Sequence, residues 1–149
     1  MQLVENKKAR FNYEIIDTLE AGIVLQGTEL KSIRKKKINI TDSYAAFKKN
    51  ELFLINAKIE HYDKANIFNH EITRPRKLLL HKREIEKLKV KLKERGLSLF
   101  PIKMYFNDRQ KVKVLLGLGK GKKKFDKRQT LKERDTKREM DRDLKQYSR

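Results

Sequence analysis

The apolar side chains of this chain are concentrated before residue 117, and this distribution limits what the chain can fold into. Residues 117–149 hold few sizeable apolar side chains: Leu118, Phe125, Leu131, Met140, Leu144 and Tyr147. These are too few to offset the chain entropy that folding would cost that segment alone. One compact domain commonly takes about 100–150 residues. We therefore expect a folded body at residues 1–116 and a tail at residues 117–149.

Positive charge dominates both parts. The chain has 39 Lys and Arg against 20 Asp and Glu, which gives a net charge of +19. Residues 1–116 carry 26 basic and 14 acidic residues (net +12), and residues 117–149 carry 13 and 6 (net +7). Such a body repels itself unless a polyanion compensates the charge, so nucleic acid is the first partner to expect.

Several classes of protein are disfavoured by what the sequence lacks. The chain has no cysteine, so it can form neither disulfides nor thiolate metal sites. Its longest apolar runs, residues 78–80 and 114–116, are far shorter than a membrane span of about 20 residues, which predicts a cytosolic protein. His61, His70 and His81 do not follow a zinc-ligand spacing and are expected to face solvent or cap a helix. We expect neither an enzyme nor a cofactor or metal site.

The body shows mainly strand patterns. Apolar residues alternate at 11–15, which predicts a strand. A second apolar run at 22–25 follows residues 20–22, where the strand pattern is expected to break. Thr28 is placed to cap a short helix that extends to about residue 33. Two hairpins are expected, 44–47 with 52–59 and 100–106 with 112–118, and Pro101 suggests a bulge. Ile85, Leu88 and Leu92 predict a helix that Gly96 ends. A short chain of such strands favours a small antiparallel barrel.

The tail and one loop are the least regular segments. Residues 117–121 alternate glycine with other residues and are expected to form a flexible leader. Residues 122–146 have good helix propensity, so the tail is expected to be disordered when free and helical on a partner. Residues 60–76 show no periodicity. They form either an RNA-contacting loop or a surface loop with its aromatic residues packed on the barrel.

Cation runs at 7–10, 31–37, 74–77 and 120–124 can bind phosphates, but phosphate contacts do not specify a sequence. Base recognition needs aromatic faces and polar groups. Phe125 stands alone among cations and is the clearest candidate for stacking. Glu20 could accept a hydrogen bond from a base amino group, although an ordinary turn carboxylate is the simpler interpretation.

Five segments of the sequence closely resemble the SmpB family of bacterial tmRNA-binding proteins: residues 7–13, 20–34, 42–44, 76–85 and 121–128. The most specific stretches are Glu-Ala-Gly at 20–22 and Arg-Lys-Leu-Leu-Leu-His at 76–81. The resemblance spans residues 6 to about 138 in the same order. It implies an oligonucleotide-binding-type (OB-fold) barrel of six antiparallel strands with about three helices. It also implies a non-enzymatic adaptor of trans-translation in the bacterial cytoplasm, with a tail that enters the empty mRNA channel of stalled ribosomes.

The implied partners are the tRNA-like domain of tmRNA, whose alanylation and delivery the family promotes, elongation factor Tu with GTP, and small-subunit ribosomal RNA at the decoding centre. The implied tmRNA-binding residues are Glu20, Leu79 and Lys113, with Lys8, Arg10, Lys31 and Arg34 expected to add contacts. The implied decoding-centre residues are Lys122, Lys123, Phe125, Asp126, Lys127 and Arg128. Phe125 replaces a common His, which keeps the stacking face but loses the ring nitrogens and any hydrogen bond they would make. Thr136 replaces a common Trp, so the tail anchor that this Trp implies is missing.

Two other functions remain open. The chain could be a ribosomal or general single-strand-binding barrel whose tail is a nonspecific electrostatic tether. A nuclease without a recognisable motif is the more distant alternative.

Overall fold

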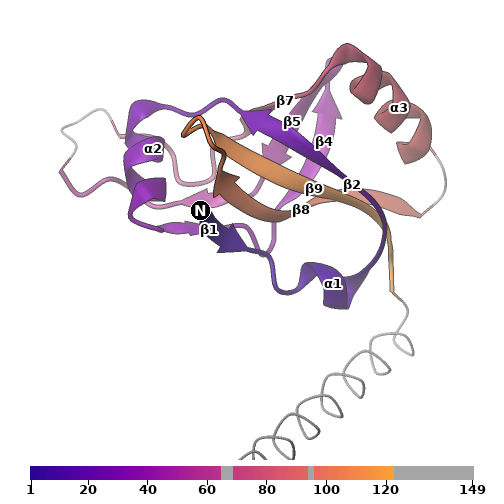
Figure 1. Cartoon of the computed structure of the whole chain (residues 1–149), viewed down its shortest axis with the longest axis horizontal. Helices are drawn as coiled ribbons and strands as arrows, with labels where there is room; N and C mark the ends of the chain where they lie inside the picture. The colour runs from indigo at the N-terminus through magenta and orange to yellow at the C-terminus, as the bar shows by residue number, and fades with distance from the viewer. Residues whose placement is uncertain (65–68, 94–95, 123–149) are drawn as a thin grey trace, which may run out of the picture.

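In the computed structural model, residues 1–64, 69–93 and 96–122 are described, and within them the protein is an antiparallel, mainly β fold with helices at its periphery (Figure 1). The strands are β1 (Gln2–Glu5), β2 (Tyr13–Ile23), β3 (Ile38–Asn39), β4 (Tyr44–Lys48), β5 (Glu51–Ile55), β6 (Lys58–Ile59), β7 (Arg76–Leu79), β8 (Leu97–Phe106) and β9 (Val112–Gly121). The helices are α1 (Ala9–Asn12), α2 (Gly27–Arg34) and α3 (Lys82–Leu92).

Seven strands form the main sheet in the order β1-β8-β9-β2-β7-β5-β4, and β3 pairs with β6 separately. All of these pairs are antiparallel. Strand β4 also lies against β8, so the sheet curves back on itself as a barrel does. The mainly β fold with antiparallel strands and three helices is therefore confirmed, although the described residues form nine strands, seven of them in the main sheet, instead of the six expected.

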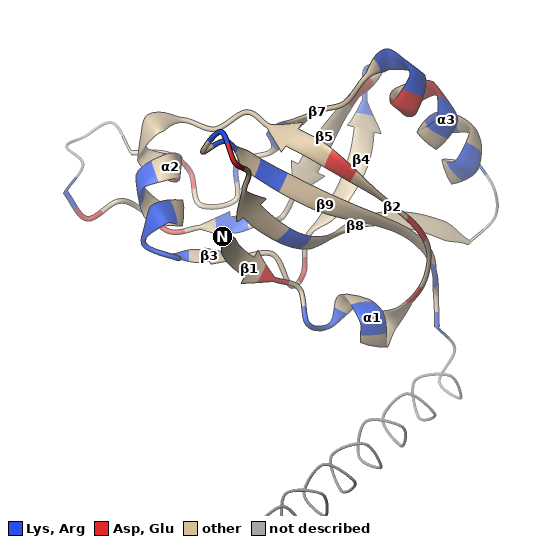
Figure 2. Ribbon diagram, in the orientation of Figure 1, with Lys and Arg blue, Asp and Glu red and all other residues tan. Residues whose placement is uncertain are grey.

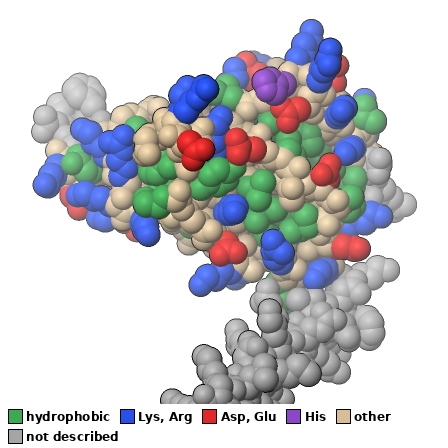
Figure 3. All heavy atoms as spheres, viewed as in Figure 1, with side chains coloured by type: hydrophobic (Ala, Val, Ile, Leu, Met, Phe, Trp, Pro, Cys, Tyr) green, Lys and Arg blue, Asp and Glu red, His purple; other side chains and the backbone are tan. Residues whose placement is uncertain are grey.

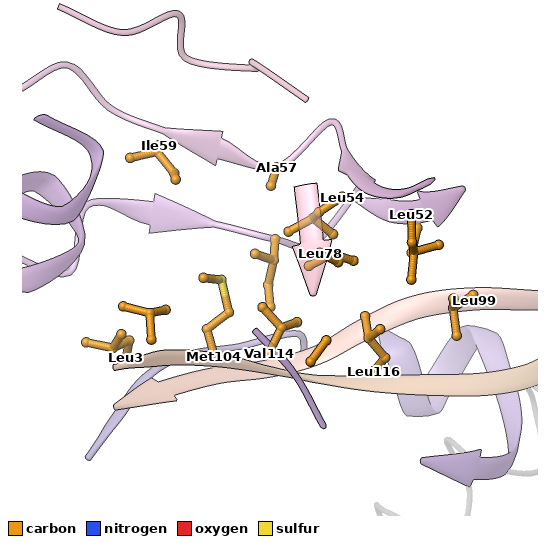
Figure 4. Close-up of a cluster of buried hydrophobic side chains, with 14 of the residues drawn as sticks. Leu3, Leu52, Leu54, Ala57, Ile59, Leu78, Leu99, Met104, Val114 and Leu116 are labelled. Atoms are coloured by element: carbon orange, nitrogen blue, oxygen red, sulfur yellow. The ribbon is translucent and has the colours of Figure 1, made fainter. Parts of the chain in front are cut away.

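The core lies inside this curved sheet. Leu99, Met104, Val114 and Leu116 project from β8 and β9 towards apolar side chains of the opposite wall (Figure 4). That wall carries Leu52, Leu54, Ala57, Ile59 and Leu78. Alternate residues of β9 are buried from Val112 to Leu116, as a strand with one face on a core requires, and residues 117–119 are then all buried. Burial of these side chains is the main favourable contribution to folding.

Several local predictions are confirmed. The expected hairpin of 44–47 with 52–59 forms as β4 and β5, and the turn between them places Lys49 and Asn50 at positive φ. Its second strand ends at Ile55, however, and residues 58–59 form β6, which pairs with β3. The β8–β9 register shifts between Pro101 and Lys103, as a bulge at Pro101 requires. Helix α3 ends before Gly96, which has a φ of +85°. Helix α2 also forms, but its N-cap is Gln26 instead of Thr28, with Glu29 completing a capping box.

The N-terminal strand predictions need correction. Phe11 lies in the short helix α1, and the strand starts only at Tyr13. A three-residue alternation cannot separate one helical turn from the start of a strand. The expected break at residues 20–22 is also wrong, because β2 runs through it with β9 on one side and β7 on the other. Its neighbouring strands hold Gly22 in an extended conformation.

The expected flexible leader at residues 117–121 is wrong as well. Strand β9 continues through these residues, past the expected end of the body at residue 116, and pairs with both β2 and β8. Glycine here makes room for close neighbours, because a Cβ on Gly117 would lie 2.8 Å from the Phe100 ring.

His70 is the histidine that departs most from expectation, because it is 3% exposed. Its Nδ1 lies 2.8 Å from the Thr28 hydroxyl and its Nε2 lies 2.9 Å from the Ile59 carbonyl oxygen. These contacts join segments that are distant in the sequence, so no local sequence pattern could predict that His70 is buried. His70 thereby ties the 60–76 loop to α2 and β6. In contrast, His81 caps α3, as one of the two expected roles requires.

Candidate nucleic-acid interface

A hollow of about 340 Å³ opens where β2, β7 and β9 lie side by side, next to the start of α3. Its lining residues are Glu20, Gly22, Leu79, Leu80, His81, Glu84 and Lys113, and we call it the Glu20 hollow. Glu20, Leu79 and Lys113, which the sequence places far apart, are thus brought together. They are the three residues that the resemblance implied as the central RNA contacts.

The strand register explains why these side chains meet. Gly22 of β2 pairs with Leu79 of β7 on one side and with Lys113 of β9 on the other. Glu20 lies two residues earlier on the same face of β2, whereas Ala21 between them points into the core and is 1% exposed. Leu79 likewise points away from the core, and half of its surface is exposed. Alternation along paired strands therefore builds the hollow.

Gly22 keeps the floor of the hollow open. A Cβ placed on Gly22 would lie 3.3 Å from the Leu79 Cβ and 3.7 Å from the Lys113 Nζ. An alanine at this position would press tightly on the Leu79 side chain, whereas the Lys113 ammonium would remain at ordinary contact distance. The small residue is needed because the Leu79 and Lys113 side chains approach the β2 backbone from either side.

Glu20 is held in place by Tyr105 of β8, whose hydroxyl donates a hydrogen bond to the Glu20 carboxylate. Burial, together with this hydrogen bond and the negative charge of Glu20, raises the pKa of Tyr105 to about 12. The phenol therefore stays protonated at neutral pH and remains a donor. Glu20 keeps further lone pairs that can accept from a ligand.

The hollow combines three kinds of group that RNA recognition uses. The Glu20 carboxylate can accept from a base amino group or a ribose 2′-hydroxyl, and the Lys113 ammonium can contact a phosphate. The exposed Leu79 side chain offers an apolar surface beside both. This arrangement suits recognition of bases and sugars of an RNA beside its phosphates.

The other four expected RNA contacts lie elsewhere on the body. Lys31 and Arg34 are on α2, whereas Lys8 caps α1 and Arg10 lies within it. Figure 3 shows Lys and Arg side chains gathered over the α2 end of the molecule, and Figure 2 shows basic positions on all three helices. The Lys31 ammonium lies 5.3 Å from the centre of the Tyr62 ring, within cation–π range. The basic residues thus extend well beyond the Glu20 hollow.

The contacts of Tyr62 distinguish between the two interpretations of the 60–76 loop, an RNA-contacting loop and a surface loop packed on the barrel. Asn69 donates from its side-chain amide to the Tyr62 carbonyl at 3.0 Å and accepts from the Tyr62 backbone N–H at 3.3 Å. The Lys35 ammonium also lies 5.1 Å from the ring centre. Tyr62 is therefore packed against α2, in agreement with the surface-loop interpretation for this aromatic residue. Phe68 lies outside the described residues.

A buried ion pair fixes α2 and its cations. Glu29 and Arg76 are both fully buried, with the Arg76 Nε donating to Glu29 Oε2 at 2.6 Å. Arg74 donates to Glu29 Oε1 at 2.6 Å, and the Gln26 backbone N–H donates to the same oxygen at 2.7 Å. Burial alone would raise the pKa of Glu29, but hydrogen bonds from Arg74, Gln26 and Arg76 outweigh it and hold that pKa below its ordinary value.

Four lining residues of the hollow had no functional prediction: Gly22, Leu80, His81 and Glu84. His81 and Glu84 form a capping box, in which the Glu84 carboxylate accepts from the His81 backbone N–H at 3.2 Å. Their spacing of three residues before an apolar run is a helix-start signal that could have placed both at this site. Tyr105 also lies beside the hollow, through its contact with Glu20.

Known proteins match this chain along nearly its whole length. The family model described as "SmpB protein" matches residues 3–146. This chain belongs to the SmpB family. An SsrA-binding protein from Sinorhizobium fredii is 56% identical over 144 residues, which cover 97% of this chain and 91% of the relative. The SsrA-binding protein of Enterococcus hirae is 51% identical over 147 residues, which cover 99% of this chain and 95% of the relative.

A solved structure of the SmpB family has the same fold. Its chain, described as "tmRNA-SmpB: a journey to the center of the bacterial ribosome", matches with a TM-score of 0.68 and 49% identity. The match covers 83% of this chain and 87% of the other. Among the described residues, no helix is long and apolar enough to cross a membrane.

Of the expected decoding-centre residues, only Lys122 is described. Its backbone N–H donates to the Asn12 carbonyl at 2.8 Å, so the chain leaves the sheet beside α1. Lys123, Phe125, Asp126, Lys127 and Arg128 lie outside the described residues, as does Thr136.

Proposed function

We propose that this SmpB-family chain binds the tRNA-like domain of tmRNA and acts as a non-enzymatic adaptor of trans-translation. The observation that carries the proposal is the convergence of Glu20, Leu79 and Lys113 in one hollow. Relatives over half identical to this chain are named for SsrA binding, and a solved structure with its fold is described by tmRNA and the ribosome.

The second part of the proposal concerns the basic residues outside the hollow, which contact the RNA backbone. Cations on α1 and α2 neutralise RNA phosphates and thereby strengthen binding without specifying a sequence. The hollow supplies the specific contacts. An RNA that fills the hollow and lies across neighbouring cations thus binds more tightly than an unrelated RNA of equal charge.

The third part of the proposal concerns the C-terminal residues, which contact the ribosome. Lys122, Lys123, Asp126, Lys127 and Arg128 enter the empty mRNA channel of a stalled ribosome, and Phe125 offers a stacking face at the decoding centre. The adaptor also promotes alanylation of tmRNA and its delivery with elongation factor Tu and GTP. This work takes place in the bacterial cytoplasm and uses binding energy alone.

The test measures affinity for the tRNA-like domain and for an unrelated RNA hairpin of equal length, across a salt series. We expect tighter binding of the tRNA-like domain at every salt concentration. Leu79→Ala should weaken that binding about three- to tenfold, because full burial of a leucine side chain is worth about 1.5–3 kcal/mol and half of the Leu79 surface is still exposed in the free protein. Val90→Ala is the matched control, because Val90 is 66% exposed on α3 and does not line the hollow.

Two results would contradict the proposal. Equal affinities for both RNAs with parallel salt slopes would favour a general RNA-binding barrel with an electrostatic tether. Loss of affinity in Leu79→Ala no greater than in Val90→Ala would remove the Glu20 hollow as the specific contact.

A further inference from the structure

A second hollow, of about 230 Å³, lies at the other end of β2, and none of its lining residues belongs to the Glu20 hollow. Its lining residues are Asn6, Lys8, Ala9, Asn12, Tyr13, Thr41, Asp42, Ser43, Tyr44 and Phe100, and we call it the Tyr44 hollow. The Asn12 carbonyl accepts from the Lys122 backbone N–H. The Tyr44 hollow therefore lies where the chain leaves the sheet, beside α1 (Figure 1).

Aromatic rings form part of its lining. Tyr13 and Phe100 stack with ring centres 4.1 Å apart and planes 15° apart, and Phe100 is 1% exposed. Tyr44 is 47% exposed, so much of its side chain is available to a ligand. A planar ligand can stack on such a ring, as bases do in proteins that bind single-stranded RNA.

Asn6 also lines this hollow, and one atom of its buried side chain, the amide oxygen, has no hydrogen-bond partner among the described residues. Asn6 is 5% exposed, and its side-chain amide nitrogen donates to the Pro101 carbonyl at 3.0 Å and to the Ile40 carbonyl at 3.4 Å. These two bonds fix which side of the amide carries the oxygen. Among the described residues the Asn6 Oδ1 has no hydrogen-bond partner, and a buried acceptor of this kind is unfavourable until a donor reaches it.

Two further lining residues, Ser43 and Asp42, add acceptors. The buried Ser43 hydroxyl donates to the Ile40 carbonyl at 2.6 Å, which leaves its oxygen free to accept. The Asp42 carboxylate is exposed and accepts only, while Lys8 contributes a single exposed ammonium. A site for phosphate alone would not place a carboxylate and unpaired acceptors around one cation.

We propose that the Tyr44 hollow binds an unpaired nucleobase that carries an exocyclic amino group. The base stacks on Tyr44 and directs its amino group towards the acceptors of Asn6 and Ser43, while Lys8 contacts the attached phosphate. Adenine and cytosine fit this pattern better than uracil, which has no amino group. The proposal rests on the RNA-binding function above and adds a contact with a single-stranded part of the RNA.

The experiment follows the backbone amide resonances of Ser43 and Tyr44 in the full chain by NMR. The probes are oligoadenylate, oligouridylate and an abasic oligoribonucleotide of equal length. We expect oligoadenylate to shift both resonances and to bind more tightly than oligouridylate. The abasic strand should leave the two resonances in place.

Variants separate stacking from charge. Tyr44→Ala should weaken oligoadenylate binding about tenfold, because stacking on an aromatic ring contributes about that factor or more, and Tyr44→Phe should retain it. Ile16→Ala is the matched control, since Ile16 is 56% exposed on β2 and does not line the hollow. Unshifted resonances, equal shifts with the abasic strand, or equal losses in Tyr44→Ala and Ile16→Ala would each overturn the proposal.

The two proposals fail in distinguishable ways. Binding of the tRNA-like domain that depends on Leu79 but no base-dependent signal at Tyr44 would overturn only the nucleobase site. A base-dependent signal without preference for the tRNA-like domain would overturn only the adaptor function.

Discussion

Glu29 and Arg76 show how single residues stabilise this fold through charge inside the protein. Each is fully buried, and the pair is surrounded by donors and acceptors that satisfy its charges. The Arg76 Nη1 donates to the Ala57 carbonyl at 2.7 Å, and its Nη2 donates to the carbonyls of Glu71 and Ile72 at 3.2 Å and 3.1 Å. One guanidinium therefore joins α2, the end of the 60–76 loop and the segment between β5 and β6.

Replacing Glu29 by Gln should destabilise the protein by about 3–5 kcal/mol, because it leaves the buried Arg76 charge without its partner. Urea unfolding at neutral pH measures this loss. The control is Glu51→Gln, which breaks the half-exposed Lys77–Glu51 pair and should cost less than about 1 kcal/mol. Similar losses in both variants would show that burial of the pair adds little.

The lowered pKa of Glu29 also predicts how stability depends on pH. A carboxyl whose folded-state pKa lies below 4.5 stabilises the fold above that pH, and the contribution is lost as the pH falls through the folded-state value. The free energy of unfolding of the wild type should therefore drop more steeply below pH 4.5 than that of Glu29→Gln. Parallel acid profiles would contradict this cause.

At the scale of the element, strand β9 is fixed by close packing on both sides. A Cβ on Gly119 would collide with the backbone carbonyl of Glu14 in β2, and one on Gly117 would collide with side chains of β8. In contrast, a Cβ on Gly121 would meet no atom within 4 Å. The same residue type thus has different roles along one strand, and only two of the three positions are set by contact.

Gly119→Ala should lower the free energy of unfolding by about 1–3 kcal/mol, because backbone atoms of β2 cannot yield as a flexible side chain would. The matched control is Gly121→Ala in the same strand, which should change it by no more than about 0.5 kcal/mol. Urea denaturation of both variants measures the difference. Equal effects would show that β2 and β9 are spaced more widely than described.

At the scale of the whole molecule, the described residues up to 122 hold the main sheet and the hydrophobic core. The core side chains come from strands throughout the described residues and from α2 and α3. The last strand in the chain, β9, lies between β8 and β2 in the main sheet and ends at Gly121. The two hollows lie at different places along the body, the Glu20 hollow near α3 and the Tyr44 hollow beside α1. This separation allows one surface to bind RNA while another part of the chain meets a second partner.

Removal of residues 123–149 should therefore leave the melting temperature and the affinity for the tRNA-like domain nearly unchanged. The same truncation should abolish peptide tagging on stalled ribosomes, because the proposed channel contacts are gone. Calorimetry, RNA binding and a tagging assay in a reconstituted translation system measure the three quantities. Joint loss of RNA binding and tagging would place the RNA site partly in the removed segment.

Local patterns in the sequence were sufficient for most elements. Alternation and turn residues predicted the β4–β5 and β8–β9 hairpins, and helical spacing predicted α2 and α3. These features are decided by neighbours in the chain, so they can be recognised without knowledge of the fold. The same local reasoning failed for Phe11, for the strand through residues 20–22 and for the glycines of β9, where partner strands decide the conformation.

The sequence by itself determined a basic, mainly β body, and its resemblance to a family indicated Glu20, Leu79 and Lys113 as one site. Only the tertiary structure decided that β2 pairs with β7 and β9 so that Gly22 lies between Leu79 and Lys113. The burial of His70, the Glu29–Arg76 pair and the Tyr44 hollow were also decided at this level. The physical reason is that these contacts join segments distant in sequence, and their free energy depends on packing that no local pattern records.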